Sequence, residues 1–356
     1  MRKTIILYAL TLCMILGGCA SHPAGEEKSE NNKEQTGAVA FPENYESIVE
    51  KVAFQTKVVV PEAFSPEGLR FTQASQRMPI QETVKTVLMD GWEDKTIREE
   101  FDEQNYYHIL TDDLHSLSVS TGIFYRGPNG YYYNNSMKFD QEGFLVNRDP
   151  LSIDGLDPEK IKGQWQELMS TLGFAAECCE TELFALPHER MAEDENATDI
   201  EENFNPEAAK PSWSKEDDAY YLVGRQTLQG LPVFHQYVFP DYTDFDAPIR
   251  MIWSRRGLES LEVAYYFDFQ EQKETVRLAD FEKAAACVAD KYNNILTDAN
   301  YVVTEAVLYQ AVLKTERTEE YQVRPAWLFR IEEISGEQKN ILIMLVDAET
   351  GEEIIL

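Results

Sequence analysis

Two amphipathic helices, each followed by apolar strands, constrain the fold of this 356-residue chain more than any other feature. Asp157 and Pro158 are typical of an N-cap and a first helical position, and an apolar stripe follows at helical spacing. Asp280 opens a second such helix, whose stripe runs from Phe281 to Tyr292. The segments after both helices read as strands. The pattern therefore predicts an α+β fold in which antiparallel sheets are each packed by a helix.

This recurrence of helix and strands reads as a diverged duplication and divides the chain. We expect a first unit over residues 151–245 and a second over 246–356, behind an N-terminal, mainly β module over 41–150. The stretch from the helix start to the second strand is longer in the first unit, because it contains the acidic segment 188–219, which we predict to be a mobile loop. Residues 261–269 alternate between apolar and polar side chains, which predicts one half-buried antiparallel strand.

The charge of the chain excludes one class of partner. It has 63 Asp and Glu against 32 Lys and Arg, a formal net charge of −31, while its 43% of hydrophobic residues suffices for a core. Phosphate backbones are bound by clustered Lys and Arg, and the sequence has no such cluster. We therefore expect no nucleic-acid partner. The surplus of acid bears on placement and solubility and is no evidence of a catalytic carboxylate.

The start of the sequence predicts where the protein resides. A short positive region precedes an apolar run over residues 5–16, which is too short for the roughly 20 residues of a membrane-spanning helix and indicates a signal peptide over 1–18. The run ends in Leu-Gly-Gly before Cys19 and resembles the bacterial lipobox, whose cysteine is diacylated. Residues 19–40 are polar and acidic and read as a solvated tether. We expect a lipid anchor at Cys19 on the extracytoplasmic face of the cell membrane.

The remaining cysteines do not suggest a disulfide framework. Adjacent Cys178 and Cys179 lie in a predicted strand and should point to opposite faces, which favours one buried and one exposed thiol over a redox or metal-binding pair. Cys287 lies among alanines on a helix flank and is expected to be a small core residue.

The C-terminal part carries a second pattern. A strand is entered through Pro325-Ala-Trp327, and a later apolar strand ends in a turn that runs from Asp347 to Gly351 and Glu352. Together with the helix that Asp280 opens, these residues resemble the PepSY-like modules of Gram-positive cell-surface proteins, including the YycH/YycI-type regulators of an envelope sensor kinase. The whole chain is similar to uncharacterised Gram-positive lipoproteins built as tether, β module and paired PepSY-like units.

This resemblance implies a helix packed on an antiparallel sheet, outside the membrane, in a protein that acts by binding. An envelope protein is then a possible partner. Trp327 is expected to fill the core between sheet and helix, and Gly351 is expected to supply the positive φ of a tight turn.

The sequence contains no catalytic signature. Its five histidines form neither H-E-x-x-H nor H-x-H, and no G-x-S-x-G, S-x-x-K, Walker or Rossmann pattern occurs. We therefore expect no enzyme, no metal and no cofactor. Two groups come nearest to a metal site, although both read better as a strand or a turn: His108, Asp112 and His115, and Asp241, Asp244 and Asp246.

The candidate binding surface is a predicted Tyr-rich hairpin over residues 124–133, with its turn at Gly127–Gly130. Some of its rings must face away from the core, where they would suit stacking on sugars or capture of a peptide; alternatively, they cover a twisted sheet. The rings are Phe124, Tyr125, Tyr131, Tyr132 and Tyr133. Two function classes follow: a binding or regulatory protein that contacts an envelope protein, or a solute- or glycan-binding lipoprotein that uses this hairpin.

Overall fold

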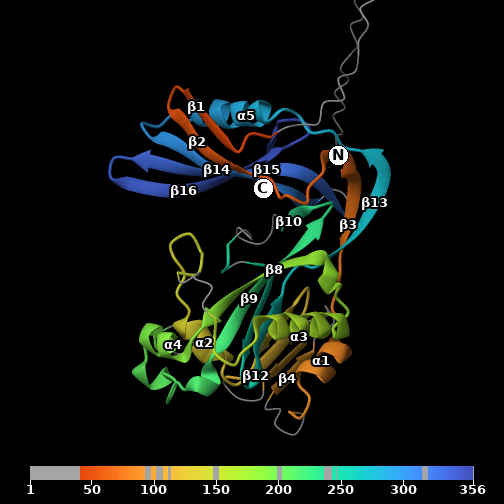
Figure 1. Ribbon diagram of the computed structural model, residues 1–356, viewed down its shortest axis with the longest axis vertical. Helices are drawn as coiled ribbons and strands as arrows, with labels where there is room; N and C mark the ends of the chain where they lie inside the picture. The colour runs from red at the N-terminus through yellow and green to blue at the C-terminus, as the bar shows by residue number, and fades with distance from the viewer. Residues whose placement is uncertain are drawn as a thin grey trace, which may run out of the picture. The chain divides into compact units, whose positions relative to one another are not determined.

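The computed structural model describes residues 41–92, 98–101, 107–110, 114–146, 152–198, 203–235, 243–245, 247–314 and 320–355. Seventeen strands in these ranges connect through ladders into one mainly antiparallel sheet, accompanied by helices, which confirms the predicted α+β class (Figure 1). The signal peptide, Cys19 and the tether 19–40 lie outside the described residues. No helix among the described residues is long and apolar enough to cross a membrane.

One series of strands, which we call the antiparallel run, pairs only in antiparallel fashion between neighbours. Its order is β4 (Arg98–Phe101), β5 (Tyr107–Leu110), β6 (Ser116–Val119), β7 (Ile123–Arg126), β12 (Gly257–Val263), β11 (Ile249–Ser254), β9 (Ala219–Leu228) and β8 (Cys179–Leu186).

The two faces of the antiparallel run are covered by different helices, because successive side chains of a strand point to opposite faces. One face packs against α1 (Gln81–Leu88) and α3 (Pro158–Thr171), with Trp165 buried between sheet and helix. The opposite face carries α2 (Gly130–Ser136) and α4 (His188–Asp194) over β8, β9 and β11. The rest of that opposite face, over β6, β7, β12 and β11, is the open face.

A second series, the mixed run, contains both parallel and antiparallel pairs. Its order is β1 (Asn44–Val49), β2 (Val52–Val59), β14 (Asn300–Lys314), β15 (Tyr321–Ser335), β16 (Gln338–Asp347) and β17 (Glu353–Ile354), with β2 and β14 parallel. Helix α5 (Phe281–Asn293) packs its apolar stripe on this run. Strand β10 (Leu231–His235) connects the two runs, because it pairs with β9 and with β14. Strand β3 (Arg70–Gln76) pairs with β15 and with β13 (Phe267–Thr275).

The residues of the C-terminal signature lie in the core and in one turn. Trp327 is 1% exposed and packs edge-on against Phe281 of α5, with ring centroids 4.9 Å apart. The buried Asp347 organises the turn, because its carboxylate accepts hydrogen bonds from the backbone N–H groups of residues 349 and 350 and from Arg324. Gly351 has a φ of 69°, as expected for a tight turn. Pro325 pairs with the turn through its carbonyl, which accepts the N–H of residue 348.

The predicted Tyr-rich hairpin is wrong. Residues 123–126 form β7, but the chain continues after the turn at Pro128–Asn129 as helix α2. Tertiary packing overrides the local hairpin signal here. The Gly130 backbone lies so close to Glu259 that a Cβ atom would be 2.4 Å from its carbonyl oxygen, and the hydroxyl of Tyr133 donates to the carbonyl of Asp217.

The single strand predicted over residues 261–269 is also interrupted. β12 ends at Val263 and β13 begins at Phe267, and Tyr265 between them has a φ of 51°. The alternation persists on both sides of the break, but the two strands pair with different partners: β12 with β7 and β11, and β13 with β3. A period of two therefore predicted the strands correctly and could not detect the bend between them.

The acidic segment 188–219 is not a loop in its described parts. Residues 188–194 form α4, residues 206–208 and 215–217 form 3-10 turns, and β9 begins at residue 219. Of its acids, Asp217 is 0% exposed and held by basic partners, which explains why acid-rich sequence is ordered here.

The predicted domain boundaries stay predictions. Ladders cross both of them, because β7 pairs with β12 and β9 pairs with β11. The thiols differ in exposure as expected, since Cys178 is exposed and Cys179 packs against the core under α3. Only Cys179 lies in a strand, however, because Cys178 ends a 3-10 helix over Ala176–Cys178. Cys287 packs against the core under α5.

Candidate functional site

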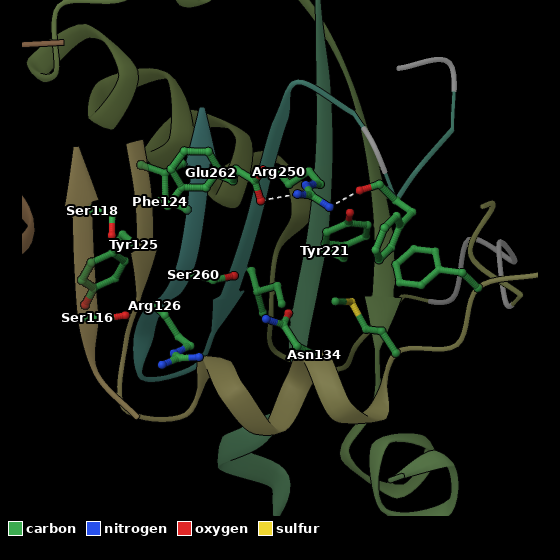
Figure 2. A pocket seen from close by; sticks show the side chains of 15 residues that line it. Ser116, Ser118, Phe124, Tyr125, Arg126, Asn134, Tyr221, Arg250, Ser260 and Glu262 are labelled. Atoms are coloured by element: carbon green, nitrogen blue, oxygen red, sulfur yellow. Dashed lines mark hydrogen bonds and ion pairs between the residues drawn. The ribbon is translucent and has the colours of Figure 1, made fainter. Parts of the chain in front are cut away.

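The open face contains a cavity of about 440 Å³ (Figure 2). The cavity is bounded by side chains of the strands and by residues of α2 and the segment after it. Two rows of side chains, set by cross-strand register, form its floor. The first row runs Ser116, Arg126, Ser260, Ile252 and Tyr221, and the second runs Ser118, Phe124, Glu262 and Arg250.

The register explains why these residues meet although they lie far apart in the chain. Directly opposed residues in an antiparallel pair bring their side chains to within contact distance on one face. The residues between them, such as Leu117, Tyr125 and Leu261, point to the opposite face and belong to the core under α1 and α3. The aliphatic side chains of these strands thus point to the face covered by α1 and α3, and the polar and aromatic side chains point to the open face.

Arg250 is the most constrained polar group of the cavity. Its guanidinium pairs with the carboxylate of Glu262 and donates to the carbonyl of Phe245 (Figure 2), while its plane lies 5.6 Å from the Phe245 ring centroid. Its Nε is buried and has no partner among the described residues. Arg250 therefore holds one wall of the cavity in place, and its Nε–H remains without an acceptor among the described residues.

Arg126 supplies a second positive charge. Its Nε donates to the carbonyl of Leu114 at 2.9 Å, and the guanidinium lies 5.8 Å from the ring centroid of Tyr131. The described lining therefore contains two guanidinium groups and one carboxylate, that of Glu262. In a chain with nearly two acids for every base, this is a local reversal of charge.

Aromatic rings and small polar groups complete the cavity. Phe124 is 42% exposed and Phe245 is 50% exposed, and Phe139 packs edge-on against the latter at 5.2 Å. The hydroxyl of Tyr221 donates to the carbonyl of Asp244 at 2.6 Å, and burial raises the pKa of this phenol, so it remains neutral. Serine hydroxyls and the Asn134 amide lie among these rings (Figure 2). The site can thus offer ring contacts, hydrogen bonds and positive charge to a ligand.

Of the aromatic residues predicted to bind, the structure brings mainly Phe124 into the cavity. Tyr125 borders it but points its ring toward His115 in the core, with centroids 5.6 Å apart. Tyr131 and Tyr133 are buried and donate their hydroxyls to the carbonyls of Thr198 and Asp217. Tyr132 is half-buried, with the Lys210 ammonium 5.2 Å from its ring centroid. For Tyr131, Tyr132 and Tyr133, the structure therefore matches the alternative stated above, in which the rings cover the fold and do not bind a ligand.

The sequence-based search missed Arg126, Arg250, Glu262 and Tyr221. The alternation of apolar and polar residues in each strand identifies the positions that face outward. The sequence does not reveal that β7 pairs with β12, and this pairing brings residue 126 close to residues 250 and 262.

Of the groups considered for metal binding, only His115 and Asp244 have side chains among the described residues. His115 is buried beside Trp92, and the carboxylate of Asp244 accepts the N–H of Leu145 at 2.8 Å. The side chain of His108, and Asp112, Asp241 and Asp246, lie outside the described residues. A different group, His188, Glu189 and Asp218, has its ligand atoms within 4.8 Å of one another. Asp218 already bonds to His188 at 2.8 Å and to Arg255 at 3.1 Å, so this group is an ion-pair cluster.

Comparison with solved structures shows a shared fold. An uncharacterized protein from Eubacterium rectale ATCC 33656 superposes with a TM-score of 0.61 at 15% identity, over 88% of this chain and 94% of that one. The C-terminal domain of YpeB from Bacillus megaterium is weakly similar, with a TM-score of 0.28 at 9% identity over 77% and 92% of the two chains. No family model and no curated protein matches the chain.

Proposed function

We propose that this chain is a lipid-anchored, extracytoplasmic binding protein whose cavity on the open face takes a small organic anion. The observation that carries the proposal is the cavity itself, in which two guanidinium groups face aromatic walls in an otherwise acidic chain. Ligand sites are typically cavities of 300–1,000 Å³ with apolar walls and a few placed polar groups. The ligand best matched to this lining is a carboxylate that also carries a ring.

A carboxylate fits because guanidinium groups bind it through charge-assisted hydrogen bonds. A ring fits because Phe124 and Phe245 are half-exposed within reach of the same space. An acidic sugar is the second ligand that such a lining would accept. Solute or glycan binding therefore remains part of the proposal, although most of the residues that line the site lie outside the predicted hairpin.

Titration of the mature chain with N-acetyl-phenylalanine, its C-terminal amide and glucuronate tests this function. We expect the acid to bind about fivefold more tightly than the amide, because a partly exposed ion pair contributes up to ~1 kcal/mol. Arg126→Gln should remove that preference, and Phe124→Ala should weaken binding of both forms. Isothermal titration calorimetry measures all of these affinities.

Phe204→Ala is the matched control, because Phe204 is 73% exposed and does not line the cavity. Equal affinity for the acid and the amide in the unmodified protein would contradict the proposal. Preferential binding of glucuronate would keep the site and change the ligand class to acidic sugars.

The anchor and the paired units belong to the same proposal. The lipobox-like residues before Cys19 support attachment through lipid, and the tether supports a position clear of an anionic membrane surface. In each half, a helix with an N-terminal aspartate precedes antiparallel strands: α3 before β8 and β9, and α5 before β14 and β15. This order supports tandem PepSY-like units.

Contact with an envelope protein is the second candidate function, and an exposed apolar patch favours it. Ile48, Val49, Ile295 and Leu296 are 80%, 41%, 40% and 103% exposed. They are neighbours because the Asn293 amide donates to the carbonyl of Val49 and the Lys51 ammonium donates to that of Ile295. Exposed acids border the patch, so the matching partner has an apolar centre and a basic rim.

One experiment in intact cells tests both anchor and partner. A photo-crosslinker at position 296 should yield a discrete adduct in the membrane fraction, whereas one at Ile355, which is 85% exposed, should not. Cys19→Ala should release the protein into the medium and abolish the adduct. Unchanged membrane retention of that variant would refute the lipid anchor at Cys19. The same unspecific pattern of adducts from both crosslinker positions would refute the proposed partner surface.

A further inference from the structure

A groove continues from the cavity of the open face. Its volume is about 560 Å³, and it shares three wall residues with the cavity: Asn134, Met137 and Phe139. The other walls are contributed by the end of α4 and the segment that follows it, over residues 193–198. A ligand that extends past Asn134 and Phe139 would therefore pass from one space into the other.

The two spaces differ in charge. The cavity is lined by two guanidinium groups and one carboxylate, whereas the groove is lined by Lys138 and three carboxylates. Two of these carboxylates already have partners: Asp194 pairs with Lys138 at 2.9 Å and with Arg190, and Glu195 accepts from Lys210 N and Trp213 Nε1. Glu193 is 72% exposed, with its nearest cation, Arg190, 3.9 Å away. The groove thus presents an accessible negative charge to a ligand.

We propose that the natural ligand is a short peptide that spans both spaces, with its carboxylate in the cavity and its amino group in the groove near Glu193. This inference rests on the proposed function, since it assigns the ligand class of the same site. A zwitterionic chain is the ligand whose two ends match the two lining charges, and an anionic sugar would match only one.

The middle of the path suits a peptide backbone. The Asn134 side chain is exposed and makes no hydrogen bond within the described part of the chain. A side-chain amide offers donors and an acceptor, which are the groups a main-chain amide requires. Asn135 is held by Thr198, whose carbonyl accepts its amide at 3.2 Å, so this wall is positioned before a ligand arrives. Phe139 and Phe245 beside it can contact an apolar side chain.

The test compares three forms of one tripeptide, Ala-Ala-Phe: the free form, the N-acetylated form and the C-terminal amide. Calorimetric titration into the mature chain should give the tightest binding for the free form, with each capped form weaker by about fivefold. Glu193→Gln should remove the difference between the free and acetylated forms and leave the effect of the C-terminal amide intact.

Glu189→Gln is the control, because Glu189 has the same 72% exposure on the same helix and does not line the groove. If the free and acetylated peptides bind equally while the amide binds less well, the peptide inference is overturned and the proposed function stands. If none of the carboxylates binds, both fail. Tighter binding of glucuronate than of any peptide form also overturns the inference.

Discussion

Replacing Asp217 with asparagine is expected to lower the free energy of unfolding by about 3–5 kcal/mol, since a buried ion pair loses one partner. Asp217 is 0% exposed, and its carboxylate contacts Arg256, the Lys210 ammonium at 3.3 Å, and the N–H and hydroxyl of Ser214 at 2.8 and 3.0 Å. Asparagine keeps the shape of the side chain and removes the charge, which leaves the Lys210 ammonium without this partner and Arg256 with only Glu259 among the described carboxylates, at 4.0 Å.

Chemical denaturation followed by circular dichroism at pH 7 measures this loss. Asp154→Asn is the matched control: Asp154 is 97% exposed and pairs with Lys215 at 3.5 Å, so its loss should cost less than about 0.5 kcal/mol. Equal, small losses in both variants would show that the Asp217 network contributes little to stability.

The same network gives the effect a pH dependence. Burial raises the pKa of Asp217, but the hydrogen bonds from Arg256 and Ser214 outweigh it and hold the pKa below its usual range. A carboxyl with a lowered folded-state pKa stabilises the fold above the ordinary value and loses that contribution as the pH falls. The asparagine variant should therefore lose less stability than the unmodified protein on acidification below about pH 4.

Asp217 also connects stability to the candidate site. Its carbonyl accepts the hydroxyl of Tyr133, a fully buried residue of α2, and the next residue along that helix is Asn134 in the cavity wall. The helix that lines the cavity is thus bonded to the backbone of a residue that the sequence placed in a mobile loop.

The parts of the fold that could be predicted are those encoded locally. Helices α3 and α5 begin at Asp157 and Asp280 as expected, and the Asp157 carboxylate accepts the N–H of Glu159 at 3.0 Å. Gly351 has the expected positive φ because the turn after β16 is a matter of a few neighbouring residues. Each of these features depends on side chains within one element or one turn.

The features that could not be predicted depend on contacts distant in sequence. Helix α2 follows a turn signal typical of a hairpin, and its first residue, Gly130, packs closely against the backbone of Glu259, which is distant in sequence. The cavity requires the register that places Arg126 opposite Ser260 and Phe124 opposite Glu262. A single sequence gives the outward positions of each strand but not which strands become neighbours, and the predicted aromatic set therefore shares only Phe124 and Tyr125 with the cavity lining.

His235 should make the fold sensitive to mild acid. The residue is 2% exposed at the end of β10, where its ring stacks on Tyr265 at 4.8 Å and lies 4.9 Å from the Phe267 ring. Burial lowers its pKa to about 4 from the usual 6.5. The unfolded chain therefore binds a proton between these two values that the folded chain does not, and the free energy of unfolding falls as the pH decreases through this interval.

The expected loss is about 1.4 kcal/mol per pH unit, or about 3 kcal/mol between pH 6.5 and 4, and it levels off below that. His235→Leu removes the proton site and leaves every carboxylate in place, so the difference in unfolding free energy between the two proteins isolates the histidine. Denaturation at intervals from pH 7 to 4 should show the unmodified protein losing stability relative to the variant. Parallel curves would mean that the folded ring binds its proton as readily as the unfolded one, and they would contradict the prediction.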